Sequence, residues 1–117
     1  MLASEKHFYK HHKAIKESNL EHILPRNASS SWNEAFPDEL VRKDLTEMIG
    51  NYAALDMASN SEVKNYGFKM KLKVLKKKAV TFKTLETVVQ YDEWNQEAIE
   101  SRTEHLANYI WNQLKLL

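Results

Sequence analysis

The apolar positions of this chain recur mainly at helical spacing, and most clearly near its C-terminal end. Residues 93–115 carry one apolar line, which comprises Trp94, Ala98, Leu106, Tyr109, Ile110 and Leu114. Because these positions fall along one side of a helix, they predict a long final helix with Asp92 as its capping residue. A first helix is predicted over residues 4–17, where Ser4 provides the cap.

Two short extended segments are predicted between these helices. Residues 19–25 end at a proline that stops any regular element, and residues 51–55 follow a glycine that breaks the preceding segment. Both segments are therefore expected to be strands. The intervening residues 26–44 are rich in turn formers and predict a long loop that Trp32 and Phe36 attach to the core.

Capping residues mark two further helices. Residues 38–48 predict a short helix that Asp38 begins. Ser59 and Glu62 match a capping box, in which the serine caps the helix and the glutamate reaches back to it. We therefore expect a helix that carries Asn60 in its first turn.

The segment 68–74, FKMKLKV, supports two interpretations. Its alternation of apolar residues and lysines is a strand signal, whereas Phe68, Leu72 and Leu75 share one face of a helix. We predict a helix here, and another short helix over residues 81–90.

Composition favours a mainly helical domain, and the two predicted strands make the expected fold class α+β. The chain has 117 residues, which is the size of one domain, and its three Trp, five Tyr and four Phe are enough for a core. Two Gly and two Pro leave little room for a β-sandwich, and the lack of cysteine excludes disulfides and thiolate metal sites. Without an apolar run of membrane-spanning length or a signal-peptide core, a cytoplasmic protein with no membrane partner is expected.

Charge is distributed unevenly, although the net charge is only +1. Residues 64–83 contain basic residues and no acid, namely Lys64, Lys69, Lys71, Lys73, Lys76, Lys77, Lys78 and Lys83. Residues 86–104 are acidic, with Arg102 as their only base. This arrangement fits a surface that faces a polyanion, or a lysine face that is merely exposed to solvent.

One run, Glu21-His22-Ile23-Leu24-Pro25, combines reactive side chains with apolar residues that can fix their backbone. A histidine titrates near neutrality and can take a proton from water, while carboxylate and amide oxygens suit Mg²⁺. Asn51 opens the second predicted strand and Asn60 begins a helix. The order of strand, long loop, strand and helix resembles the ββα-metal finger of HNH endonucleases.

A narrower resemblance is to the HNH-type C-terminal nuclease domain of GmrSD-like modification-dependent restriction enzymes. It rests on the run above followed by Trp32, Ile49-Gly50-Asn51, Asn60 and Asn65-Tyr66-Gly67-Phe68-Lys69. Near the C-terminal end, the closing residues of that family are matched by Trp94, Ile99, Arg102, Leu106 and Trp111. The chain differs at Thr46-Glu47-Met48-Ile49, where the family often has a histidine or arginine.

The resemblance implies a role for each matched residue. His22 would be the general base, Glu21 and Asn60 would be ligands of Mg²⁺ or Mn²⁺, and Asn51 would be the structural residue of the long loop. DNA-binding residues are expected among the lysines, at Lys64, Lys69, Lys71 and Lys73.

We therefore expect one HNH-type nuclease domain over residues 1–117, divided into an N-terminal helix (1–18), a ββα-metal core (19–78) and C-terminal helices (79–117). Its expected function is metal-dependent DNA cleavage in a restriction or anti-phage defence system, with targets chosen by an upstream or partner nucleotidase or recognition domain. The alternative is a catalytically inactive HNH-fold module that binds nucleic acid. A helical protein-interaction domain would leave the acid-His and Asn series unexplained.

Overall fold

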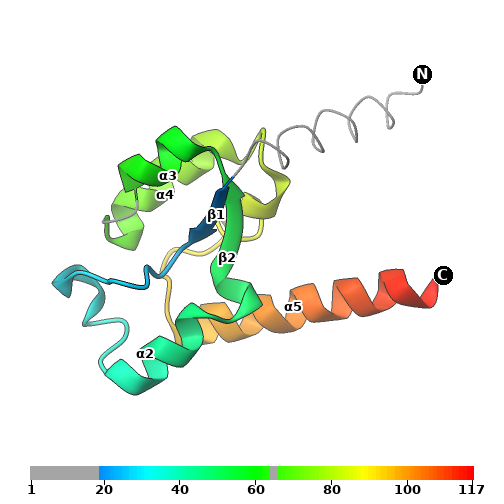
Figure 1. Ribbon diagram of the computed structural model, residues 1–117, viewed down its shortest axis with the longest axis horizontal. Helices are drawn as coiled ribbons and strands as arrows, with labels where there is room; N and C mark the ends of the chain where they lie inside the picture. The colour runs from blue at the N-terminus through cyan, green and yellow to red at the C-terminus, as the bar shows by residue number, and fades with distance from the viewer. Residues whose placement is uncertain (1–18, 64–65) are drawn as a thin grey trace.

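The computed structural model describes residues 19–63 and 66–117, and it places a short hairpin between two groups of helices (Figure 1). The strands β1 (Asn19–His22) and β2 (Tyr52–Leu55) pair antiparallel, with Glu21 opposite Ala53 and His22 opposite Tyr52. The helix predicted over residues 4–17 lies outside the described residues.

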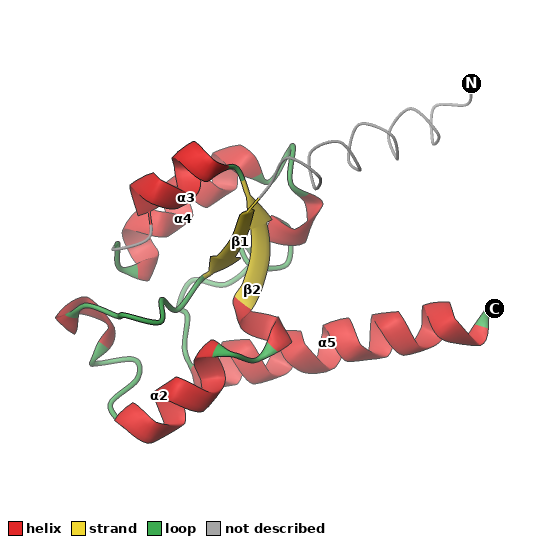
Figure 2. Cartoon of the chain, viewed as in Figure 1, coloured by secondary structure: helices red, strands yellow, loops and turns green. Residues whose placement is uncertain are grey.

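Helices make up most of the remaining described chain (Figure 2). The α-helices are α2 (Glu39–Thr46), α3 (Met57–Val63), α4 (Phe68–Lys78) and α5 (Gln96–Lys115). Short 3-10 turns are formed by η1 (Ser30–Trp32), η2 (Ile49–Asn51) and η3 (Lys83–Leu85). The α+β, mainly helical fold with a two-stranded hairpin and a long C-terminal helix is thereby confirmed.

The core lies where the hairpin meets these helices. Its wholly buried apolar side chains come from the end of each hairpin segment, from α3, α4 and α5, and from the stretch around η3; they comprise Ile23, Leu24, Leu55, Val63, Leu75, Leu85, Val88 and Ile99. Trp32 and Phe36 are also buried, so the long loop is attached to the core at the two predicted positions. Burial of this apolar surface is the main force that fixes the hairpin between the helices.

Local signals predicted two helices correctly. Asp38 caps α2, because its side chain accepts hydrogen bonds from the backbone N–H groups of Leu40 and Val41 at 2.9 and 3.2 Å. The lysine-rich segment is the helix α4 and not a strand, since Phe68 and Leu75 on one face are buried in the core.

Other helix boundaries differ from the predictions. α3 begins earlier than expected, because Asp56 and not Ser59 caps it, accepting the N–H of Ser59 at 3.0 Å. α5 begins later than expected, because Asn95 caps it by accepting the N–H of Ala98 at 2.9 Å. Within residues 81–90, only the short turn η3 forms in place of the predicted helix.

The C-terminal half of α5 extends beyond the rest of the described fold (Figure 1). Trp94 is buried as expected, but the side chain of Trp111 is 59% exposed and is not part of the core. None of the helices in the described ranges combines the length and the apolar character needed to cross a membrane.

Candidate active site at the end of the hairpin

The structure brings three predicted site residues to one pocket. Glu21 and His22 end β1, and Asn60 lies on α3, which follows β2 directly. A pocket of about 250 Å³ is lined by Leu20, Glu21, His22, Pro25, Arg26, Asn27 and Asn60. The Asn60 Nδ2 lies 3.5 Å from the carbonyl oxygen of Leu20, which ties the helix to the strand beside the pocket.

Glu21 is held by an ion pair beneath this pocket. Its side chain is only 2% exposed, and its Oε1 accepts a hydrogen bond from Lys71 Nζ at 2.8 Å. The other carboxylate oxygen, Oε2, is buried and has no hydrogen-bond partner among the described residues. Burial raises the pKa of Glu21, and the Lys71 charge opposes that shift. Because Lys71 binds Oε1, Oε2 is the oxygen of this carboxylate that is left for a cation.

Lys71 is not at the DNA-facing surface where it was expected. The side chain is wholly buried, and its ammonium donates to the carbonyl oxygens of Ile23 at 2.8 Å and His22 at 3.2 Å as well as to Glu21. Burial lowers the pKa of Lys71, and the Glu21 charge opposes this effect. The expectation for Lys71 is therefore corrected. Its ammonium binds three oxygen atoms of the protein, so this lysine fixes the end of β1 and is not available to DNA phosphates.

The other predicted DNA-binding lysines have different outcomes. Lys69 and Lys73 are exposed on α4, where a phosphate can reach them. Lys64 lies outside the described residues.

His22 has one buried and unpaired ring nitrogen. Its Nε2 makes no hydrogen bond with any described residue and lies 3.9 Å from Glu47 Oε2. The imidazole packs edge-on against the ring of Tyr52, with 4.9 Å between ring centroids. Burial lowers the pKa of His22 below its ordinary 6.5, the positive charge of Arg26 adds to this, and Glu47 opposes it. A lowered pKa keeps the imidazole neutral near pH 7, which is the form that accepts a proton.

Asn51 joins the loop after β1 to the rest of the fold. It is wholly buried, and its Oδ1 accepts hydrogen bonds from the Leu24 N–H at 2.8 Å and from Trp94 Nε1 at 3.0 Å. Its Nδ2 donates to the carbonyl oxygens of Leu24 at 2.9 Å and Thr46 at 3.0 Å. All four hydrogen-bonding positions of the amide are thus used, and they tie the backbone at Leu24 to Thr46 and Trp94.

Arg102 supports the hairpin from α5. The guanidinium is buried and donates to the carbonyl oxygens of Gly50 at 2.8 Å, Tyr52 at 2.6 Å and Thr84 at 2.8 Å. Burial lowers the pKa of Arg102 to about 10. No acid forms a salt bridge with it in the described part of the chain, so three backbone carbonyls take the place of a carboxylate.

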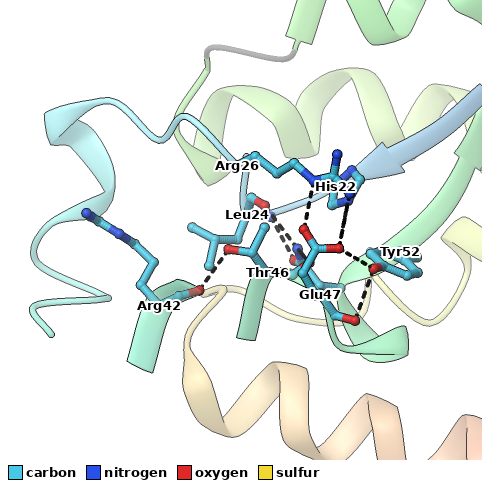
Figure 3. A network of polar contacts seen from close by, with 8 residues as sticks. His22, Leu24, Arg26, Arg42, Thr46, Glu47 and Tyr52 are labelled. Atoms are coloured by element: carbon cyan, nitrogen blue, oxygen red, sulfur yellow. Dashed lines mark hydrogen bonds and ion pairs between the residues drawn. The ribbon is translucent and has the colours of Figure 1, made fainter. Parts of the chain in front are cut away.

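Three residues around His22 were not predicted as functional (Figure 3). Arg26 forms a two-point ion pair with Glu47, through Nε to Oε1 at 2.7 Å and Nη2 to Oε2 at 3.1 Å. The Tyr52 hydroxyl donates to Glu47 Oε2 at 2.8 Å. The sequence offered one signal, which was the acid at Glu47 where the resembled family often has a base.

The donor set of the pocket fits a hard divalent cation. Within residues 19–63 and 66–117, no three His, Cys, Asp or Glu side chains form a metal-binding cluster by themselves. Glu21 supplies an unpaired, buried carboxylate oxygen, however, and Asn60 adds an amide to the same pocket. Such a sparse oxygen set suits Mg²⁺, which retains several of its own waters.

Comparison with known proteins identifies a family for this chain. The family described as GmrSD restriction endonucleases, C-terminal domain, matches residues 2–109. No curated protein and no solved structure was found to match the chain. The family match spans most of the 117 residues and includes the whole candidate site. The chain therefore belongs to the GmrSD restriction endonuclease family as a C-terminal domain, and this membership implies a nuclease whose substrate is DNA.

Proposed function

We propose that this domain hydrolyses DNA phosphodiester bonds as a metal-dependent, HNH-type nuclease. The observation that carries the proposal is the convergence of Glu21, His22 and Asn60, from two separate elements, on one pocket. A neutral imidazole beside an unpaired carboxylate oxygen is a suitable combination for activating water next to a phosphate.

Glu21 and Asn60 would hold the cation, which is Mg²⁺ or Mn²⁺. Lys71 binds Oε1 of Glu21 at 2.8 Å and so fixes the carboxylate with Oε2 left over. A divalent cation at this position would stabilise negative charge that develops on the scissile phosphate.

His22 performs the proton transfer in this proposal. Its imidazole takes one proton from a water molecule, and the resulting hydroxide attacks the phosphorus atom. The phosphorus–oxygen bond to one sugar then breaks, and the leaving oxygen receives a proton from solvent. The packing of His22 against Tyr52 and the hydrogen bonds of Asn51 hold the base in place for this step.

DNA affinity would come from phosphate contacts and carry no base preference by itself. Lys69 and Lys73 remain exposed on α4, and lysines supply point charges to phosphates without a base code. Selection of the target then belongs to an upstream or partner domain.

The second candidate is a module of the same fold that binds nucleic acid without cleaving it. One observation favours it, namely the short contact between Lys71 Nζ and Glu21 Oε1, which already neutralises the carboxylate. Such a neutralised carboxylate binds Mg²⁺ less strongly than a free one.

Plasmid nicking separates the two candidates. We expect the purified chain to nick supercoiled plasmid with Mg²⁺ or Mn²⁺ and not with EDTA. His22→Ala should lower the rate by about 10²–10⁴-fold, the usual cost of losing a general base. His105→Ala is the matched control, because His105 is exposed on α5 outside the pocket.

Two results would contradict the nuclease proposal. A folded His22→Ala protein that nicks at the wild-type rate would show that His22 is not the base. A wild-type chain that binds DNA but does not nick it with either metal would support the binding module.

A further inference from the structure

The carboxylate of Glu47 is fixed more firmly than an exposed glutamate usually is. Its side chain is 48% exposed, yet Arg26 binds both carboxylate oxygens and the Tyr52 hydroxyl binds Oε2 (Figure 3). The backbone carbonyl of Glu47 is a second acceptor for the single Tyr52 hydroxyl proton, at 3.0 Å. The hydrogen bonds from Arg26 and Tyr52 lower the pKa of Glu47 from 4.5 to about 2, so the carboxylate is charged at neutral pH.

This fixed carboxylate faces the buried nitrogen of His22. Glu47 Oε2 lies 3.9 Å from His22 Nε2, which is too far for a hydrogen bond but close enough for a direct electrostatic effect on the ring. Nε2 itself is inaccessible to solvent. The 17% of the side chain that is exposed therefore excludes Nε2, so Nδ1 is the only ring nitrogen of this pocket-lining residue that water can reach.

We propose that Glu47 is a positioning residue for His22, and that its carboxylate keeps the imidazole proton on Nε2 so that the lone pair of Nδ1 faces water in the pocket. This inference rests on the proposed nuclease function, because it names the residue that prepares the base. A neutral imidazole carries one N–H group and one lone pair, and its surroundings decide which nitrogen carries each. A lone pair on Nε2 would point toward a carboxylate oxygen, which is repulsive, whereas an N–H group there is attracted.

The same carboxylate helps after the proton moves. When Nδ1 accepts a proton from water, both nitrogens carry N–H groups and the ring becomes positively charged. Glu47 Oε2, at 3.9 Å, then stabilises the charge that forms on His22. Arg26 has a complementary role, since its pairing with Glu47 prevents an uncompensated acid from repelling the DNA phosphate.

The first test reads the position of the proton directly. In histidine-¹⁵N-labelled chain without metal, we expect the His22 nitrogen shifts of an Nε2–H tautomer at neutral pH. Glu47→Gln removes the charge but keeps the shape, so the two nitrogen shifts should converge or exchange order. Glu86→Gln is the matched control, because Glu86 is also an exposed glutamate paired with a basic residue, Lys83, at 2.9 Å. That control should leave the His22 shifts unchanged.

The second test separates positioning from folding. We expect Glu47→Gln to lower kcat for plasmid nicking by roughly 10–100-fold, as removal of an outer partner of a functional histidine typically does, without raising KM. Tyr52→Phe keeps the charge and removes one of its two anchors, so the decrease in kcat should be smaller. A substitution that merely damaged the fold would lower the apparent kcat only in proportion to the folded fraction, which far-UV circular dichroism measures for each variant.

The two tests fail in distinguishable ways. If Glu47→Gln retains both the wild-type His22 shifts and the wild-type kcat, the role of Glu47 is refuted while the nuclease function stands. If the wild-type His22 shifts show the proton on Nδ1, the proposal is also refuted. If the wild-type chain does not nick DNA, the nuclease proposal fails, and the nitrogen shifts still decide whether Glu47 controls the tautomer.

Discussion

Replacement of Lys71 by methionine tests the arrangement beneath the pocket. Lys71→Met keeps an unbranched side chain of similar length but removes the ammonium that Glu21 and two backbone carbonyls bind. The Glu21 carboxylate, 2% exposed, would then be a buried charge without a partner. On the earlier interpretation of Lys71 as a DNA-facing lysine, the same substitution would leave stability unchanged.

The expected loss can be worked from the contacts. Removal of one partner from a buried ion pair typically costs about 3–5 kcal/mol, because the remaining charge is left uncompensated. Small domains have total stabilities of about 5–15 kcal/mol, so this is a large part of the whole. With a urea dependence of about 2 kcal/mol per molar, the unfolding midpoint should fall by about 2 M.

Urea unfolding followed by far-UV circular dichroism measures this change. Lys73→Met is the control, since Lys73 is exposed on the same helix and its substitution should change stability by no more than about 0.5 kcal/mol. The double variant Lys71→Met with Glu21→Gln should recover part of the loss, because it removes the unpaired charge. If Lys71→Met is as stable as Lys73→Met, the buried ion pair is refuted, and Lys71 is an exposed lysine as the sequence predicted.

Three further predictions concern close packing, acid stability and DNA affinity. Gly50→Ala should destabilise the fold by about 1–3 kcal/mol in urea unfolding, because a Cβ there would overlap the backbone of α5, whereas Gly67→Ala, with only ordinary contacts, should be neutral or stabilising. Since the pKa of Glu47 is lowered from 4.5 to about 2, its stabilising effect is present above pH 4.5 and lost toward pH 2; Glu47→Gln should therefore flatten the decline in stability over this interval. Replacing Lys69 and Lys73 with Gln should reduce the log–log salt slope of DNA binding by about 0.9 per contacting lysine, and an unchanged slope in fluorescence anisotropy would exclude them as phosphate contacts.

The parts of the fold that follow from local chemistry were predictable. Both predicted extended segments contain a strand, but β1 stops at His22, three residues before its proline, and β2 begins at Tyr52 because Asn51 belongs to η2. Asp38 had only to accept N–H groups two and three residues ahead, so the start of α2 could be read directly. Asp56 and Asn95 offered equally good caps, and the choice between neighbouring capping residues depended on packing that no local pattern records.

The sequence motif predicted the pocket residues Glu21, His22 and Asn60, but it did not predict the ion pairs around them. Lys71 lies on the same helical face as Phe68 and Leu75, which are buried, so the spacing contained a sign that this lysine points inward. Because the segment contains many lysines, Lys71 was grouped with the exposed ones and its place on the buried face was missed. Glu47 meets Arg26 only because the loop after β1 returns to the end of α2, and such a long-range contact has no local signature.

The contacts that hold the hairpin can form only late in the synthesis of the described chain. The hairpin is held by Trp94 through Asn51, by Arg102 through Gly50 and Tyr52, and by the Thr103 hydroxyl, which accepts the N–H of Gly50 at 2.9 Å. Ribosomes synthesise both strands before these three residues, and a lone two-stranded hairpin is marginally stable in water. A nascent chain that stops short of Trp94 therefore carries Glu21 and His22 on a hairpin that lacks the contacts from Trp94, Arg102 and Thr103. The contacts that frame the pocket from α5 and its preceding loop are therefore complete only once residues 94–103 have been synthesised.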